Sequence, residues 1–285
     1  MSSSHSQNQT SALLSNFLQN ARRELLIAGI FLLTYVPTLC WMWERWFARD
    51  SYYSHGILVP FVSGFLIWQK REELQKTEFV KSNWAVPLIV AGIAIHILSS
   101  ILRVYFTSGL SMMIVLFGLV LYIYGKETFH KIIFPLAFLL FMIPMPMVVV
   151  TNISFRMKVF AAQIAAYMLN NMRLPAIREG SIIKMRHAYV IVDDVCSGLR
   201  SLISLTALGA IFAYWMKSGP TKKILLFLST IPIAIITNVF RIIFLSFISE
   251  VWGSEYATGF IHDLSGFLVF ALAFILLFAV GKLLE

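Results

Sequence analysis

Apolar residues along this chain are grouped into long runs that short polar segments separate. A spanning helix needs roughly 20 mostly apolar residues, because the hydrocarbon core of a bilayer is about 30 Å thick. Runs that approach this length lie near residues 25–43, 56–69, 86–102, 104–124, 132–150, 201–216, 224–247 and 263–284. The pattern therefore predicts an all-α polytopic membrane protein with about eight transmembrane helices.

Two features are predicted between the fifth and sixth of these runs. Residues 152–172 are long enough for a ninth span, but Arg156, Lys158 and Gln163 interrupt them. A central charge costs about 2.5–3.5 kcal/mol on insertion scales, so the segment is predicted to be an amphipathic helix on the outer surface. The β-branched runs SIIKM and AYVIVDDV that follow predict a small hairpin leading into Cys196.

The N-terminal residues differ in composition from the rest of the chain. Residues 1–20 are polar and mostly uncharged, with no basic start and no small-residue cleavage site, so no cleaved signal peptide is expected. The prediction is a polar tail over 1–20 and a single membrane-embedded domain over 21–285. No internal repeat is visible, so self-similarity gives no support to a transporter built from inverted repeats.

Composition agrees with a bilayer as the solvent, because 59% of the residues are hydrophobic and 13% are charged. The formal net charge of +9 is spread over short clusters, with no basic domain for nucleic acid. If the N-terminus is cytoplasmic, the clusters at 70–81, 126–131 and 217–223 fall inside, whereas the short outer loops hold only Arg45, Arg49 and Arg103. This asymmetry predicts an inner-membrane protein with both termini in the cytoplasm.

Cys196 lies in the segment DDVCSGLRSL, at the outer end of the sixth span. Ser197 and Gly198 have the composition of a turn that starts a helix. The partial positive charge of a helix N-terminus favours a thiolate, and Arg200, one turn further on, adds a cation on the same face. Cys196 is therefore a candidate nucleophile facing the periplasm.

Arg241 lies in the segment NVFRI of the seventh span, 17 residues after Ile224. A helix that begins at the inner surface raises it by about 26 Å, to the outer boundary. An intramembrane arginine is costly unless it faces protein or water, and an oxyanion is a suitable partner for it. Asn238, one turn below, is in a position to hold the guanidinium group or to share a substrate contact.

His262 begins the eighth span at the same outer level, where an imidazole acts as a base or acid near neutral pH. Asp263 and Ser265 are predicted to cap that helix. Cys196, Arg241 and His262 thus reach one membrane depth, as cysteine acyl transfer requires: a nucleophile, an oxyanion partner and a proton carrier. No cofactor or metal is predicted, since C-x-x-C spacing is absent.

Plainer roles for the cysteines remain open. A lone cysteine in a membrane protein often only fills space, which is the expectation for Cys40 inside the first span. Composition alone supports packing and catalysis about equally for Cys196. A disulfide between the two cysteines in an oxidising compartment would remove the nucleophile.

Alternatives remain open for the other two residues as well. Arg241 could anchor its helix end by reaching lipid phosphates, and His262 could simply solvate a helix start. His55 and His187 are also predicted outside, so either competes with His262 as the base.

The motifs Cys196-Ser197-Gly198, Asn238 to Arg241 and the downstream His262 resemble the exosortase and archaeosortase family. The stretch SHGILVPFVS at 54–63, the length and the eight-span organisation extend the resemblance over most of the chain. It implies that 21–285 is an exosortase-like domain of a membrane-embedded cysteine protease or transpeptidase, a hydrolase whose catalytic trio is Cys196, Arg241 and His262.

The resemblance also implies the substrates. They are exported proteins with a C-terminal PEP-CTERM sorting signal, made of a Pro-Glu-Pro motif, a transmembrane helix and a basic tail. Cleavage would occur at the outer face of the bacterial inner membrane, and the family is linked to exopolysaccharide export. The alternative from another class is a non-catalytic transporter or export partner that binds an anionic lipid-linked substrate through Arg241. The implied partners are these substrates and membrane lipids, and no oligomeric state is predicted.

Overall fold

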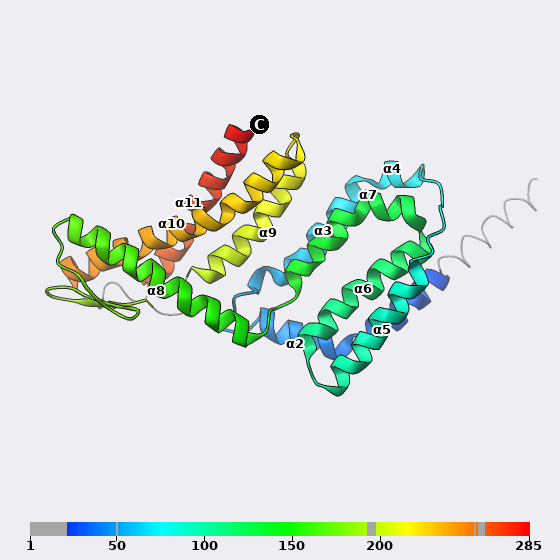
Figure 1. The fold of residues 1–285 in the computed structure, drawn as a ribbon, viewed down its shortest axis with the longest axis horizontal. Helices are drawn as coiled ribbons and strands as arrows, with labels where there is room; N and C mark the ends of the chain where they lie inside the picture. The colour runs from blue at the N-terminus through cyan, green and yellow to red at the C-terminus, as the bar shows by residue number, and fades with distance from the viewer. Residues whose placement is uncertain (1–21, 50, 193–197, 254, 256–259) are drawn as a thin grey trace, which may run out of the picture.

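The computed structural model describes residues 22–49, 51–192, 198–253, 255 and 260–285, and only the backbone of residues 260, 262 and 263. Two groups of helices lie side by side (Figure 1). The N-terminal group consists of the helix Arg22–Thr34, α2 (Val36–Trp46), η1 (Ser54–Ile57), α3 (Leu58–Gln69), α4 (Arg71–Gln75), α5 (Ala85–Ile101), α6 (Tyr105–Ile123), α7 (Gly125–Phe138) and η2 (Leu139–Met142). The C-terminal group consists of α8 (Met147–Asn171), β1 (Ile177–Glu179), β2 (Ile182–Lys184), β3 (Tyr189–Ile191), α9 (Leu199–Trp215), α10 (Pro220–Trp252) and α11 (Phe260–Leu284).

The first predicted span, 25–43, is two helices rather than one. The helix Arg22–Thr34 and α2 meet at a bend of 65°. Pro37 lies in the first turn of α2, and a proline lacks the N–H that would continue the preceding helix. The corner residue Tyr35 is 1% exposed, and its hydroxyl lies 3.1 Å from the hydroxyl of Ser111 on α6. The bend therefore packs against the α5–α6 hairpin.

The fifth predicted span, 132–150, is also interrupted. Helix α7 ends at Phe138, η2 adds one tighter turn, and a new helix begins only at Met147. Pro144 and Pro146 interrupt the helix here, so the run that the sequence predicts as one span is not one continuous helix. By contrast, Pro135 lies inside α7 and is accommodated there.

Helix α8 confirms the helix predicted over 152–172 but begins earlier and covers 25 residues. Its buried face is made of small side chains, including Ser154, Ala161 and Ala165, and it packs against α10. Its length and composition make it a candidate membrane span. The interfacial position of this segment therefore stays a prediction.

The chain is a multi-pass membrane protein by the length and composition of its helices. Among the described residues, four helices can cross a membrane: Tyr105–Ile123, Met147–Asn171, Pro220–Trp252 and Leu264–Leu284. The bent pair at the N-terminus makes five if it forms one span. Helices α5 and α9 are apolar but have only 17 residues each, and α3 has 12. The predicted count of eight is thus confirmed only in part, because several apolar runs fold into helices shorter than a bilayer needs.

The predicted hairpin is confirmed and is part of a larger sheet. Strands β2 and β3 pair antiparallel with Ile182 opposite Ile191, and β1 adds a third strand on the other side of β2. Strand β1 is not predicted from the sequence because this three-residue strand carries two charged side chains. Ile183 is fully buried among residues of α8 and α10. The sheet is therefore fixed to the helices that lead to the candidate site.

Helix α10 connects the parts of the C-terminal group. Its buried apolar side chains pack in one hydrophobic core with α8 and the sheet, and in a second hydrophobic core with α9 and α11. Its 33 residues correspond to about 50 Å, more than the roughly 30 Å hydrocarbon core. One helix can therefore cross the bilayer and still reach the sheet beyond it.

Candidate functional site

The start of α9 is fixed by a close contact between Gly198 and α10. Gly198 has a φ of +78°, in the left-handed region that favours glycine. A Cβ atom on it would lie 2.8 Å from Cγ and 3.0 Å from Nδ2 of Asn238. The Asn238 side chain thus fills the place where any other residue would carry its Cβ. Cys196 and Ser197 immediately precede this contact and lie outside the described residues.

Asn238 is a buried amide at this junction. It is 2% exposed, and its Nδ2 has no hydrogen-bond partner among the described residues. An unsatisfied buried donor costs about 1–3 kcal/mol, so such groups are rare unless they serve a purpose. The predicted supporting residue therefore lies against the start of α9 and is equipped to donate a hydrogen bond.

Arg241 lies one turn further along α10 and is 7% exposed. Its Nε donates a hydrogen bond to Oγ of Ser265 on α11 at 3.0 Å. A Cβ atom on Gly266 would lie 3.3 Å from Nη2 of the same side chain, so the guanidinium group rests on the α11 backbone. A cavity of about 100 Å³ lies beside it, lined also by Phe240, Phe244 and Leu268. Contacts with α11 thus fix the plane of the guanidinium group.

The backbone of His262 lies in the first turn of α11, one turn before Ser265. Three helical residues rise about 4.5 Å, so the backbone of His262 is close to the partner of Arg241. The orientation of its imidazole lies outside the described residues. Arg200 lies half-buried in the first turn of α9, two residues after Gly198.

Ser265 does not have the capping role that the sequence predicts. It was predicted to cap the last helix, but α11 begins at Phe260, and Ser265 is 3% exposed inside the helix. There its hydroxyl accepts the hydrogen bond from Arg241. The available signal was the adjacent pair Ser265-Gly266, because two small residues allow a large cation to approach a helix backbone.

The two competing histidines have different surroundings. Nδ1 of His55, in η1, lies 3.3 Å from the hydroxyl of Ser204 on α9. Burial lowers the pKa of His55 below 6.5, which favours the neutral imidazole at neutral pH. His187 is exposed between β2 and β3, and its backbone N–H donates to a carboxylate oxygen of Glu250 at 3.0 Å. His55 therefore touches the helix that follows Cys196, whereas His187 is anchored at the end of α10.

Cys40 does not fill the interior as predicted. It is a free cysteine on α2, and its side chain is exposed. Across the described part of the chain, no group of three or more His, Cys, Asp and Glu side chains could hold a metal ion.

The Gly198 contact leads to a testable prediction. Gly198→Ala forces a non-glycine residue into the left-handed region and pushes Cβ into Asn238, so a loss of about 1–3 kcal/mol is expected. Gly219, which precedes α10, has a φ of −64° and open space around it, so Gly219→Ala is the matched control. Thermal unfolding in detergent should show a lower midpoint for the first variant only. Equal midpoints for both variants would contradict this picture of the junction.

These observations define a class first: a helical multi-pass membrane protein whose buried arginine and asparagine join the starts of two other helices. The chain matches the transmembrane exosortase family over residues 41–279, more than four fifths of its length, and belongs to that family. The matched range begins within α2, includes most of α11 and contains all the predicted site residues. No curated protein and no solved structure matched the chain.

Proposed function

We propose that this protein is a membrane-embedded cysteine transpeptidase or protease that cleaves the C-terminal PEP-CTERM signal of exported proteins. In this proposal it acts at the outer face of the bacterial inner membrane, in connection with exopolysaccharide export. The observation that carries the proposal is the junction itself, where Asn238 contacts Gly198 and Arg241 bonds Ser265. Membership of the transmembrane exosortase family supports the reaction class.

Covalent geometry supports Cys196 as the nucleophile. Only Ser197 separates it from Gly198 in the sequence, and two Cα-to-Cα steps along an extended chain span at most about 7 Å. The Cα atom of Cys196 is therefore within that reach of a glycine whose neighbour is Asn238. A cysteine just before a helix gains thiolate character from the partial positive charge of the helix N-terminus.

The proposed reaction uses each residue in turn. The Cys196 thiolate attacks the scissile carbonyl carbon, and Arg241 stabilises the negative charge that develops on the carbonyl oxygen. When the C–N bond breaks, His262 gives a proton to the leaving amine and a thioester to Cys196 remains. Water or an acceptor amine then attacks the thioester carbonyl carbon, and His262 accepts its proton. The C–S bond breaks, which releases the product and regenerates the Cys196 thiolate. Hydrolysis and transpeptidation differ only in this acceptor.

The expected substrate has a shape that suits this position. Its apolar helix would lie in the bilayer with its basic tail on the cytoplasmic side, as the distribution of positive charge in membrane proteins favours. Its Pro-Glu-Pro segment would then reach the outer face, where the starts of α9 and α11 are proposed to lie. The scissile bond would meet the junction without leaving the membrane surface.

The transporter alternative has less support. Arg241 is 7% exposed, and the cavity beside it is about 100 Å³. Apart from Arg241 and Ser265, the residues that line this cavity are apolar, so it offers few polar groups to the headgroup of a lipid-linked sugar. A single oxyanion can be stabilised by the guanidinium group alone.

The proposed function can be tested by co-expression with a reporter that ends in Pro-Glu-Pro, an apolar helix and a basic tail. We expect a shortened reporter only when the protein is present. A matched reporter with Ala-Ala-Ala in place of Pro-Glu-Pro should keep its full length. Shortening that is independent of the protein, or of this motif, would overturn the proposal.

A further inference from the structure

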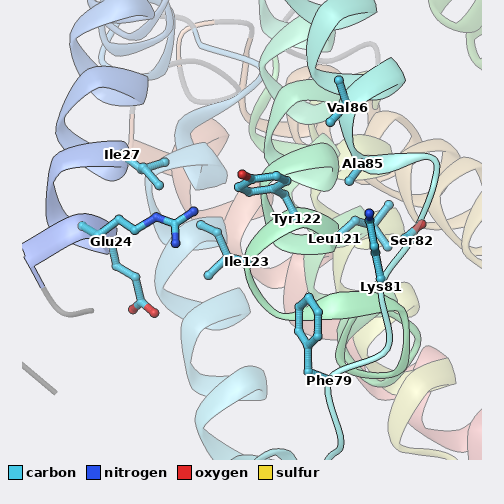
Figure 2. Close-up of a pocket in the computed structure, with 11 residues that line it drawn as sticks. Glu24, Ile27, Phe79, Lys81, Ser82, Ala85, Val86, Leu121, Tyr122 and Ile123 are labelled. Carbon is cyan, nitrogen blue, oxygen red and sulfur yellow. The ribbon is translucent and has the colours of Figure 1, made fainter. Parts of the chain in front are cut away.

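A cavity of about 450 Å³ lies in the N-terminal group, away from the junction of α9, α10 and α11 (Figures 1 and 2). The first turns of the helix Arg22–Thr34 form one wall, and the last turn of α6 forms another. The loop before α5 and the first turn of α5 complete it. These four segments meet at the end of the group where basic residues gather, which the charge rule places on the cytoplasmic side.

The lining of this cavity has an excess of positive charge. Arg23 and Lys81 contribute two cations, while Glu24 is its one carboxylate among the described residues. Glu24 accepts a hydrogen bond from the hydroxyl of Tyr124 at 3.2 Å, so this carboxylate has a partner that does not line the cavity. Glu24 and Lys81 lie on opposite sides of Tyr122 in Figure 2. The Lys81 side of the cavity is therefore suited to an anion.

Arg23 is held at the cavity by an aromatic ring. Its guanidinium carbon lies 5.9 Å from the centroid of the Tyr122 ring, within the range of a cation–π contact. The hydroxyl of Ser82 lies on the same side as Lys81 and adds a further polar group (Figure 2). Two cations and a hydroxyl from two segments thus line one cavity, and such groups are suited to bind a phosphate.

Apolar side chains also line the cavity, beside its charged groups. Ile27, Phe79 and Val86 are among them. Two residues next to the lining ones in the sequence are also apolar and exposed, since Leu26 is 65% exposed and Trp84 is 71% exposed. Tryptophan is enriched at membrane interfaces, at the level of the headgroups. A ligand in this place therefore meets cations at one end and a hydrocarbon-compatible surface at the other.

We propose that this cavity binds the phosphate headgroup of an anionic phospholipid from the cytoplasmic leaflet, with Arg23 and Lys81 at the phosphate. The acyl chains lie along the exposed apolar side chains beside Trp84. The apolar border selects a lipid over a soluble phosphate, because a soluble anion gains nothing from that surface. Basic pockets between membrane helices recognise headgroups in this way. The proposal does not depend on the proposed peptidase function.

The test uses the full-length protein in detergent, with native mass spectrometry to measure bound phosphatidylglycerol. Replacing both Arg23 and Lys81 with alanine should weaken binding about 30-fold, given the usual contribution of each basic residue near a membrane surface. The matched control replaces Lys76 and Lys126 with alanine. This removes the same charge from the same end of the protein, but neither lysine lines the cavity. The control should bind phosphatidylglycerol as the wild type does.

Further measurements separate the possible ligands. Inorganic phosphate should fail to displace phosphatidylglycerol, and phosphatidylcholine should bind more weakly. The single variant Lys81→Gln changes an exposed loop residue, so it should fold even if the double variant does not. It should bind phosphatidylglycerol about fivefold more weakly than the wild type. Unchanged binding in both variants would overturn the proposal. Equal loss in the control pair, or full displacement by inorganic phosphate, would overturn it as well.

Discussion

Replacing Cys196 with alanine should abolish processing of a PEP-CTERM reporter and leave the protein inserted in the membrane. The variant removes the only group proposed to form a covalent bond with the substrate. Loss of a nucleophile that acts in concert with its base lowers catalytic rates by orders of magnitude, so at least a 1000-fold decrease, by order-of-magnitude estimate, is expected. The measurement is the rate at which the reporter is shortened, compared at equal amounts of membrane-inserted protein.

Cys40 provides the matched control for this experiment. It is an exposed free cysteine on α2, so Cys40→Ala removes a thiol without opening a cavity. This variant should process the reporter at the wild-type rate. Wild-type processing by Cys196→Ala would reject the proposed nucleophile, and loss of activity in both variants would point to a general effect of removing thiols.

Replacing Arg241 with alanine should produce the second large effect. Removing one oxyanion-stabilising group from an enzyme typically costs about 100- to 1000-fold in rate. Arg241 is buried and holds α10 to α11 through Ser265, so the variant should also unfold at a lower temperature. Arg241→Lys keeps the charge but lacks the Nε donor, and it should recover stability better than rate.

Two comparisons separate chemistry from packing at Arg241. Ser265→Ala removes the acceptor of the Nε hydrogen bond and leaves the cation, so a smaller loss of rate is expected. Ile236→Ala shortens a side chain that is 61% exposed on the same helix, and it should leave the rate unchanged. A folded Arg241→Ala protein that processes the reporter at the wild-type rate would exclude this residue from the reaction.

The helical character of the fold could be predicted because apolar runs, the helix start at Leu199 and the hairpin are local patterns. The points at which helices are interrupted were harder to predict, because a proline is compatible either with a bend within a helix or with the end of a helix. Pro135 remains inside α7, whereas Pro144 and Pro146 end the helix. The difference depends on whether neighbouring elements satisfy the released backbone groups. The number of spans depends on the same contacts.

At the candidate site, Arg241 could be predicted from the sequence, but its hydrogen-bond partner Ser265 could not. A buried arginine is conspicuous in an apolar run, so Arg241 and the nearby Asn238 could be selected from the sequence. Ser265 could not, because a serine near a helix start is usually a cap. Its contact with Arg241 depends on how α10 packs against α11. The contact between Gly198 and Asn238 likewise joins segments that are distant in the sequence. Such contacts are set by packing and leave little trace in local composition.

The most direct measurement of the central claim is mass spectrometry of a covalent intermediate between this protein and the reporter. Incubation followed by acid quenching should trap a thioester that joins Cys196 to the new C-terminus of the reporter. Hydroxylamine should release the adduct, and Cys196→Ala should not form it. Efficient shortening of the reporter by Cys196→Ala, with no thioester in the wild-type protein, would contradict the account.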